Sequence, residues 1–205
     1  MKRLAQELSL EGQPRAFAGS LMNSSADLVA RACDGDQEAF RLIFERYSRP
    51  IISFIFDLVG NRELAEDLAQ ETFVRAHRGL HALREETKLS TWLFGIAKNV
   101  ARESLRLRAR LTQNVELDDA KVLQLSDGEP APVDQLLNRE LNGVIRRSLA
   151  ALDEDKRVVF ALKIFHQCSY EEIAEITGFS IPKLKTDLHR ARIEMRRRIG
   201  PYVRV

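Results

Sequence analysis

Six polar residues near the C-terminus mix cations with hydrogen-bonding groups and could read the edges of DNA bases. They are Lys183, Lys185, Thr186, Asp187, His189 and Arg190. On an exposed helix face, these side chains would match the donors and acceptors that base pairs present in the major groove. The later arginines, Arg192 and 196–198, suit DNA phosphates. The alternative is a solvated basic helix, because cations are favoured at any helix C-terminus.

A second set of residues has the types that bind single-stranded nucleic acid. Trp92, Asn99, Arg102 and Arg106 follow each other at spacings of 7, 3 and 4 residues, which puts them on one side of a helix. A base stacked on an aromatic ring contributes about 1–3 kcal/mol, while cations hold the backbone. Taken alone, a tryptophan on an amphipathic helix is more often a core residue, so both interpretations stay open at this point.

A third set lies on the outward side of a predicted helix and is acidic. It consists of Asp67, Gln70, Glu71 and Val74. Carboxylates beside a DNA surface repel phosphate, so this face is expected to meet a protein, or else to be an ordinary solvated face. Neighbouring carboxylates also suit acid–base catalysis, but no histidine, nucleophile or metal-ligand set lies beside Asp67 or Glu71 in the sequence. We expect no enzyme and no cofactor.

The elements that must position the first set have the signals of a helix-turn-helix. Ser169 and Glu172 form a capping-box pattern, and Gly178 stands where a helix needs a left-handed end. Ala174, four residues before that glycine, supplies the small side chain at the contact between two helices. Ser180 is expected to cap the long second helix, whose apolar side is Leu184, Leu188, Ala191 and Met195.

The N-terminal half is expected to be a bundle of amphipathic helices. Asp36 begins the first, with Phe40, Ile43, Phe44 and Tyr47 on its apolar side, and Pro50 marks a break or bend before a second helix at 51–59. A third helix covers about 62–78. Ser90 caps a fourth, which follows a loop at 81–89 and carries Trp92.

The charge distribution divides the chain into parts. Residues 136–205 hold 14 basic and 9 acidic residues, whereas 111–135 hold one basic and six acidic residues together with turn-forming Asp, Gly and Pro. We therefore predict an all-α protein with a flexible extension at 1–23, a helical domain at 24–110, an acidic flexible linker at 111–135 and a second helical domain at 136–205.

The composition is that of a globular protein of the cytoplasm. Apolar residues make up 44% and charged residues 30%, no apolar run reaches the length of a membrane span, and the N-terminus lacks the apolar core of a signal peptide. Cys33 and Cys168 lie far apart and match no metal-ligand spacing. They are expected to be thiols in a reducing compartment.

Five motifs in order give the chain a resemblance to a known family. They are GDQEAF at 35–40, AEDLAQETF at 65–73, TWLFGIAKN at 91–99, SYEEIA at 169–174 and LHRAR at 188–192. In these motifs the chain resembles the bacterial sigma factors of the extracytoplasmic-function group, the compact two-domain members of the sigma-70 family. The resemblance covers about 25–110 and 136–200.

The resemblance implies a role for each set of residues. Asp67, Gln70, Glu71 and Val74 would dock on the clamp of the largest subunit of core RNA polymerase. The loop at 81–89 would hold a base flipped out of the minus-10 element, and the helix that follows the loop would support it. The residues expected to bind the minus-10 element are His81, Leu83, Arg84, Trp92, Asn99, Arg102 and Glu103. The six C-terminal residues, from Lys183 to Arg190, would bind the minus-35 duplex in promoter DNA.

The same resemblance implies control by an anti-sigma factor. The competing hypothesis is a stand-alone helix-turn-helix regulator that binds a palindrome as a dimer, which would leave the acidic face and the Trp92 helix unexplained.

Two departures from the family affect the DNA surfaces. Members usually carry GTVKSR where this chain has PKLKTD at 182–187, so Asp187 is expected either to accept from a cytosine amino group or to pair with a neighbouring cation. Gly95 replaces a larger polar residue.

Overall fold

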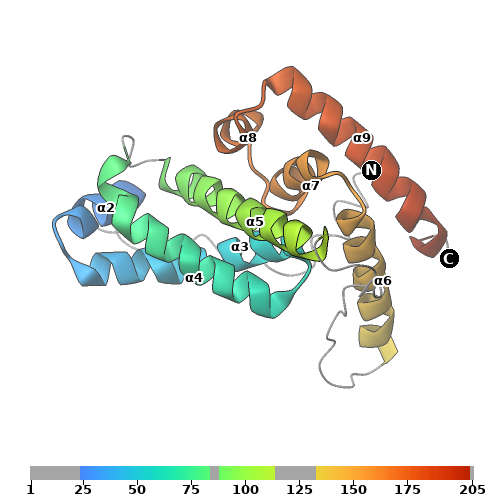
Figure 1. Ribbon diagram of the computed structural model, residues 1–205, viewed down its shortest axis with the longest axis horizontal. Helices are drawn as coiled ribbons and strands as arrows, with labels where there is room; N and C mark the ends of the chain where they lie inside the picture. The colour runs from blue at the N-terminus through green and yellow to red at the C-terminus, as the bar shows by residue number, and fades with distance from the viewer. Residues whose placement is uncertain (1–23, 84–87, 114–132, 204–205) are drawn as a thin grey trace.

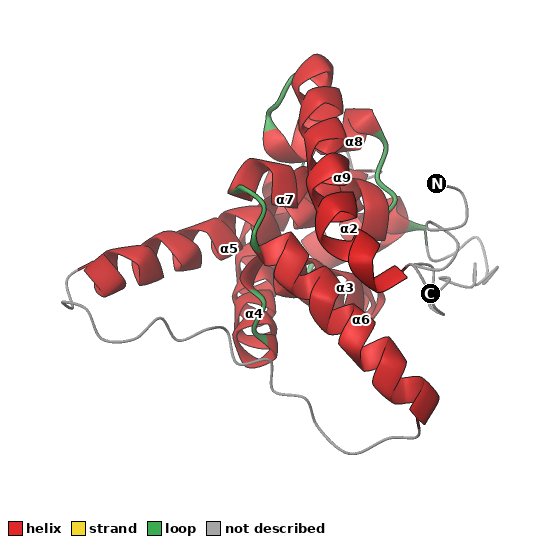
Figure 2. Cartoon of the chain, turned by 90° about the vertical axis from the view of Figure 1, so that its right-hand side faces the viewer, coloured by secondary structure: helices red, strands yellow, loops and turns green. Residues whose placement is uncertain are grey.

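The computed structural model describes residues 24–83, 88–113 and 133–203. Throughout these residues the regular structure is helical and no strand occurs, which confirms the all-α prediction (Figures 1 and 2). The predicted extension at 1–23, Arg84 and most of the predicted linker lie outside the described residues. The domain boundaries stay a prediction.

Residues 24–83 and 88–113 form the N-terminal bundle. Its elements are α2 (Ser25–Cys33), α3 (Gln37–Val59), α4 (Arg62–Gly79), η1 (Leu80–Ala82) and α5 (Leu89–Gln113). The long helices α3, α4 and α5 pack against one another, and their apolar sides meet in the interior. The buried side chains include Ile43, Ile55, Phe73 and Leu93.

Local capping fixes where the helices of this bundle begin and end. The Asp36 carboxylate accepts from the backbone N–H groups of Glu38 at 2.9 Å and Ala39 at 3.2 Å, so Asp36 begins α3 as predicted. The hydrogen bond from the Arg31 guanidinium to Asp36 lowers the pKa of that carboxyl. Gly60 ends α3 with φ 71°, a left-handed conformation that suits glycine.

Two predicted boundaries in this bundle are wrong. Helix α3 continues through Pro50 to Val59 instead of dividing into two helices. Proline removes one backbone hydrogen bond, but the apolar contacts of Ile43 before it and Ile51 after it hold both halves in one line of packing. Ser90 lies inside the first turn of α5, which begins at Leu89, and does not cap it.

Residues 133–203 form the C-terminal bundle. Its elements are α6 (Val133–Ala150), α7 (Glu154–Phe160), the single π-helical turn η3 (Ala161–Phe165), α8 (Tyr170–Thr177) and α9 (Ile181–Val203). The capping box at the start of α8 is confirmed, because the Ser169 hydroxyl accepts from the Glu172 N–H and the Glu172 carboxylate accepts from the Ser169 N–H. Gly178 ends α8 with φ 75°.

The turn after Gly178 leads into α9 and completes the predicted helix-turn-helix. The predicted inner side of α9 is confirmed, since Leu184, Leu188, Ala191 and Met195 are all buried. Helix α9 packs on α6 and α7, and α8 lies beside its N-terminal part (Figure 1). This packing leaves the opposite side of α9 open.

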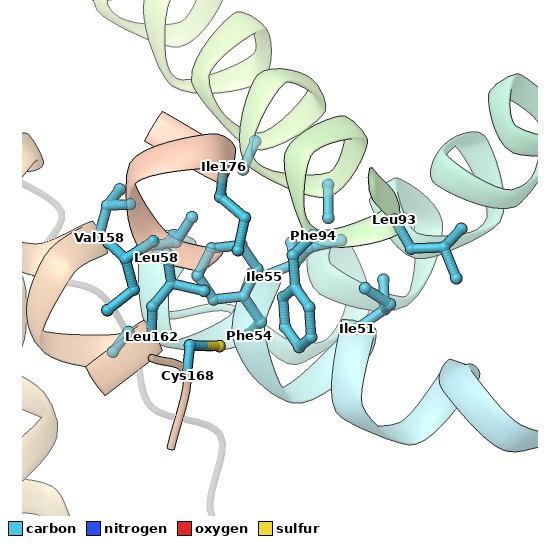
Figure 3. Packing of buried hydrophobic residues seen from close by; sticks show 14 of the residues in the cluster. Ile51, Phe54, Ile55, Leu58, Leu93, Phe94, Val158, Leu162, Cys168 and Ile176 are labelled. Atoms are coloured by element: carbon cyan, nitrogen blue, oxygen red, sulfur yellow. The ribbon is translucent and has the colours of Figure 1, made fainter. Parts of the chain in front are cut away.

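The two bundles lie against each other. Figure 1 shows α7 and α8 along one side of α5, with α4 on the other side. Their apolar side chains form a continuous buried cluster, in which Phe54 and Phe94 of the N-terminal bundle meet Leu162 and Ile176 of the C-terminal bundle (Figure 3). None of the described helices combines the length and the apolar character needed to cross a membrane.

Candidate nucleic-acid interface

The open side of α9 presents a row of hydrogen-bonding and charged groups. Lys185, Thr186, His189 and Arg190 are all exposed, and they repeat at helical spacing on the side opposite the buried Leu188. The Thr186 hydroxyl donates to the Pro182 carbonyl at 3.0 Å. The row therefore offers three cationic or titratable side chains and a hydroxyl on one rigid helix.

Asp187 does not belong to this row, and the prediction that it faces outward is wrong. It is 9% exposed, and its carboxylate accepts from the Lys183 ammonium at 2.5 Å. Lys183 also lies 3.7 Å from the centre of the Phe179 ring, which keeps the ammonium close to the turn. Of the two alternatives for Asp187, the structure shows the pairing with a neighbouring cation. The open face of α9 consequently carries no carboxylate from this residue.

Helix α5 carries the second set of candidate residues. Asn99 and Arg106 are exposed, as predicted for a surface row. Trp92 is half-buried: its ring packs over Gly79, where a Cβ atom would lie 3.5 Å from the indole. The tryptophan therefore belongs partly to the core and partly to the surface. Arg102 is half-buried and ion-paired, which the sequence did not indicate.

A cleft of about 590 Å³ opens beside Trp92. On one side it is lined by Leu83, Trp92 and Asn99, three of the residues predicted to form a base pocket. On the other side it is closed by 175–178 at the end of α8. His81 lies exposed in η1, next to this region in sequence.

Glu103 takes part in a different group of charges. Its carboxylate pairs with Arg75 of α4 at 2.8 Å, and this hydrogen-bonded partner lowers the pKa of Glu103. Arg75 pairs in turn with Glu71 at 2.7 Å. Glu103 thus connects α5 to the acidic face of α4. From the sequence, it was instead expected among the residues around the base pocket.

The acidic face of α4 is exposed as predicted. Asp67, Gln70, Glu71 and Val74 all reach the surface. Beside them lies an apolar hollow of about 340 Å³, lined by Phe40, Phe44, Gln70, Phe73, Val74, His77 and Arg78. Phe44 and Val74 are each 42% exposed, so this surface combines carboxylates with uncovered apolar side chains. Such a combination fits a protein partner better than DNA.

Some residues of these surfaces were missed or misplaced from the sequence. Phe44 was assigned to the core because it follows Phe40 at helical spacing. Helical spacing identifies the apolar side of a helix, but it does not distinguish a residue at the centre of that side from one at its exposed edge. Lys98 is buried beside α8, although a lysine is rarely buried. Across the described ranges, no group of three His, Cys, Asp or Glu side chains could hold a metal ion.

Two family models match the chain. Sigma-70 region 2 matches residues 43–111, and Sigma-70, region 4, matches residues 143–195. The first match contains the α4 face and the α5 surface, and the second contains the helix-turn-helix. The three candidate surfaces thus fall within the two matched regions.

Curated proteins resemble the chain over nearly their whole length. The ECF RNA polymerase sigma-E factors of Salmonella typhimurium and Escherichia coli are each 30% identical over 182 residues, covering 86% of this chain and 95% of the relative. The RNA polymerase sigma-H factor of Pseudomonas aeruginosa is 31% identical over 183 residues, covering 86% and 94%.

Solved structures share the fold. CnrH in complex with the cytosolic domain of CnrY matches with a TM-score of 0.65 and 22% identity, covering 86% of this chain and 97% of that one. The sigma factor RpoE in complex with the anti-sigma factor NepR, from Bartonella quintana, matches with a TM-score of 0.61 and 24% identity, covering 78% and 96%.

Proposed function

The chain belongs to the extracytoplasmic-function group of sigma-70 factors, and from that membership we propose how its three surfaces divide the work of starting transcription. The α9 row binds the minus-35 duplex, the α5 surface holds the opened minus-10 strand, and the α4 face docks on core RNA polymerase. The observation that carries the proposal is that the three surfaces lie on three different helices. Each surface also has the chemistry that its partner requires.

The α9 row suits a major groove. Lys185 and Arg190 can donate to guanine, and Thr186 and His189 can bond to bases or phosphates. The pairing of Asp187 with Lys183 keeps its carboxylate off this face and so removes a source of repulsion toward phosphate. We propose that Lys183 acts through the turn and not through a direct base contact, because its ammonium is already held by two carboxylates.

The α5 surface suits a single strand. The exposed edge of Trp92 offers a stacking platform, Asn99 offers donor and acceptor groups, and Arg102 and Arg106 offer cations to the backbone. The cleft beside Trp92, which Leu83 also lines, has room for a base turned out of the helix, and the exposed His81 lies two residues before Leu83 in the chain. Melting is then favoured because stacking offsets the loss of pairing.

The α4 face suits the polymerase. Charge complementarity from Asp67 and Glu71 can steer a basic partner, while Phe44 and Val74 give apolar area that is uncovered in the free protein. Phe44 is thereby added to the four docking residues expected from the sequence.

Asp67→Lys is expected to weaken binding to core polymerase by roughly tenfold, because a reversed charge at a steered interface replaces attraction with repulsion. Asp67 is exposed, so the fold should be unaffected. The measurement is the affinity of labelled full-length protein for core polymerase. The matched control is Asp34→Lys, an equal charge change at the exposed end of α2. Equal affinity for wild type, Asp67→Lys and the control would contradict the docking role of α4.

Regulation and location follow from the same membership. We propose that an anti-sigma factor holds the protein inactive in the cytoplasm; support comes from the structural relatives, one of which is described as a sigma factor with its anti-sigma factor. The protein would supply no catalytic chemistry of its own, since the polymerase makes the RNA.

The test of the divided roles is to map the start sites of transcripts that core polymerase makes on genomic DNA with and without the purified chain. Two sequence elements at a fixed separation upstream of the added start sites are expected. Starts that share a palindrome and no second element would favour a stand-alone regulator instead.

A further inference from the structure

The C-terminal bundle covers two cations that flank the α5 surface. The Lys98 ammonium donates to the Ile176 carbonyl at the end of α8, at 2.6 Å, and Lys98 is only 8% exposed. Nearer the start of α5, Lys88 pairs with Glu175 of α8 at 2.8 Å. Groups that could hold a DNA backbone are therefore occupied by the helix-turn-helix.

Glu154 and Asp155, in the first turn of α7, form an acidic pair that contacts Arg102 of the α5 surface and Lys183 at the start of α9. The Arg102 guanidinium donates to the Glu154 carboxylate through Nε and to Asp155 Oδ1 through Nη2, the latter at 3.2 Å. The other oxygen of Asp155 accepts from Lys183 of α9 at 3.0 Å. The acidic pair thus connects the α5 surface to the start of the recognition helix, with Asp155 as the shared partner of both cations.

Apolar and polar contacts continue this interface behind the charges. The His166 ring packs against Phe54 and Phe94, with centroid separations of 5.5 and 5.2 Å, and the Arg157 guanidinium donates to the Leu58 carbonyl at 2.7 Å. Cys168 lies in the same buried cluster as Phe54 (Figure 3). The bundles therefore meet over a packed interface and not through one salt bridge.

This arrangement excludes a DNA strand from α5. A phosphate approaching Arg102 would meet the carboxylates of the acidic pair. Residues 175–178 form one wall of the cleft beside Trp92, so the strand on either side of a base in that cleft would meet the C-terminal bundle. Burial also lowers the pKa of Lys98, which disfavours its charged form while the interface is closed.

We propose that the contact between the bundles is autoinhibitory, with the C-terminal bundle occupying the single-strand surface of α5 and the acidic pair acting as its electrostatic latch. This inference rests on the proposed minus-10 role of α5. The latch is suited to reversal, because Arg102, Glu154 and Asp155 keep 28%, 39% and 40% of their side-chain surface exposed. Partly exposed ion pairs contribute modestly and are screened by salt, so a competing charged partner can replace them.

The native thiol of Cys168 gives a direct measure of opening. Cys168 is 9% exposed, and burial raises its pKa to about 11, so alkylation is slow while the bundles stay together. We expect the double variant Glu154→Gln/Asp155→Asn of the full-length chain to be alkylated by iodoacetamide at Cys168 about threefold to tenfold faster. Cys33 of α2, measured in the same digest by mass spectrometry, serves as the reference thiol.

Two further variants separate opening of the interface from local damage to α7. Arg102→Gln removes the partner on the other bundle, so it should accelerate Cys168 alkylation to a similar degree without altering α7. Combined with the acidic-pair variant, it should add little, because both changes break the same contact. The matched control Glu63→Gln/Glu171→Gln removes two exposed carboxylates elsewhere and should leave the rate unchanged. Unchanged alkylation in Arg102→Gln, or fully additive effects, would overturn the latch.

Binding to a fluorescein-labelled oligothymidylate tests whether the closed interface inhibits. The acidic-pair variant, in which Arg102 is intact, is expected to bind several-fold more tightly than wild type, and the control is not. Equal affinity together with faster Cys168 alkylation would overturn the inhibitory role. Because these measurements need neither polymerase nor promoter, a failure here is distinguishable from a failure to start transcription.

Discussion

Replacing Phe54 with alanine is expected to lower the free energy of unfolding by about 3–5 kcal/mol. The ring is fully buried, and its edge-on contacts with Phe94, 5.2 Å between centroids, and with His166, 5.5 Å, join α3, α5 and the segment before α8. Removing the ring leaves a cavity where the two bundles meet. Unfolding in urea, followed by circular dichroism, measures the loss.

The control for this prediction lies on the same helix. Phe44→Ala removes an equal ring that is 42% exposed, so about 1–2 kcal/mol is expected, most of it from the contact with Phe73. Equal losses for the two substitutions would show that Phe54 does not occupy the packed junction described above.

The second large effect is expected at the α9 row. Lys185→Ala and Arg190→Ala should each reduce transcription from a promoter with its natural minus-35 element by roughly tenfold to a hundredfold, the cost of losing a base contact of about 1–3 kcal/mol. Both side chains are exposed, so the fold and the affinity for core polymerase should be preserved.

A charge-matched control distinguishes this role from general electrostatics. Arg49→Ala removes an exposed cation from α3, far from α9 in sequence, and should leave promoter output unchanged. If Arg190→Ala behaves like Arg49→Ala on every promoter, the α9 row does not read the minus-35 element.

Features set by neighbouring residues were predictable from the sequence. The capping box of Ser169 and Glu172 and the left-handed end at Gly178 depend on a few adjacent residues, so they place α8 and the turn correctly. The same holds for Asp36 at the start of α3. The buried side of α9 follows from its helical period. Together these signals specify the helix-turn-helix and which side of it is open.

Features that depend on packing between distant residues were not predictable from the sequence. Pro50 favours a break by its own chemistry, yet contacts on both sides of it keep α3 continuous. Asp187 was expected on the outward side of its helix, but its pairing with Lys183 lets it be buried. The contacts of Arg102 with Glu154 and of Lys98 with Ile176 join residues 52 and 78 positions apart, and a single sequence gives no signal for such pairs.

The central claim is that this chain directs core RNA polymerase to promoters, and run-off transcription tests it most directly. Purified core polymerase, the full-length chain and a linear template carrying a candidate promoter are combined, with each protein omitted in turn. We predict a discrete transcript of the length set by the promoter only when both proteins are present. The contradicting result is no specific transcript, together with nanomolar binding of the chain alone to a duplex operator.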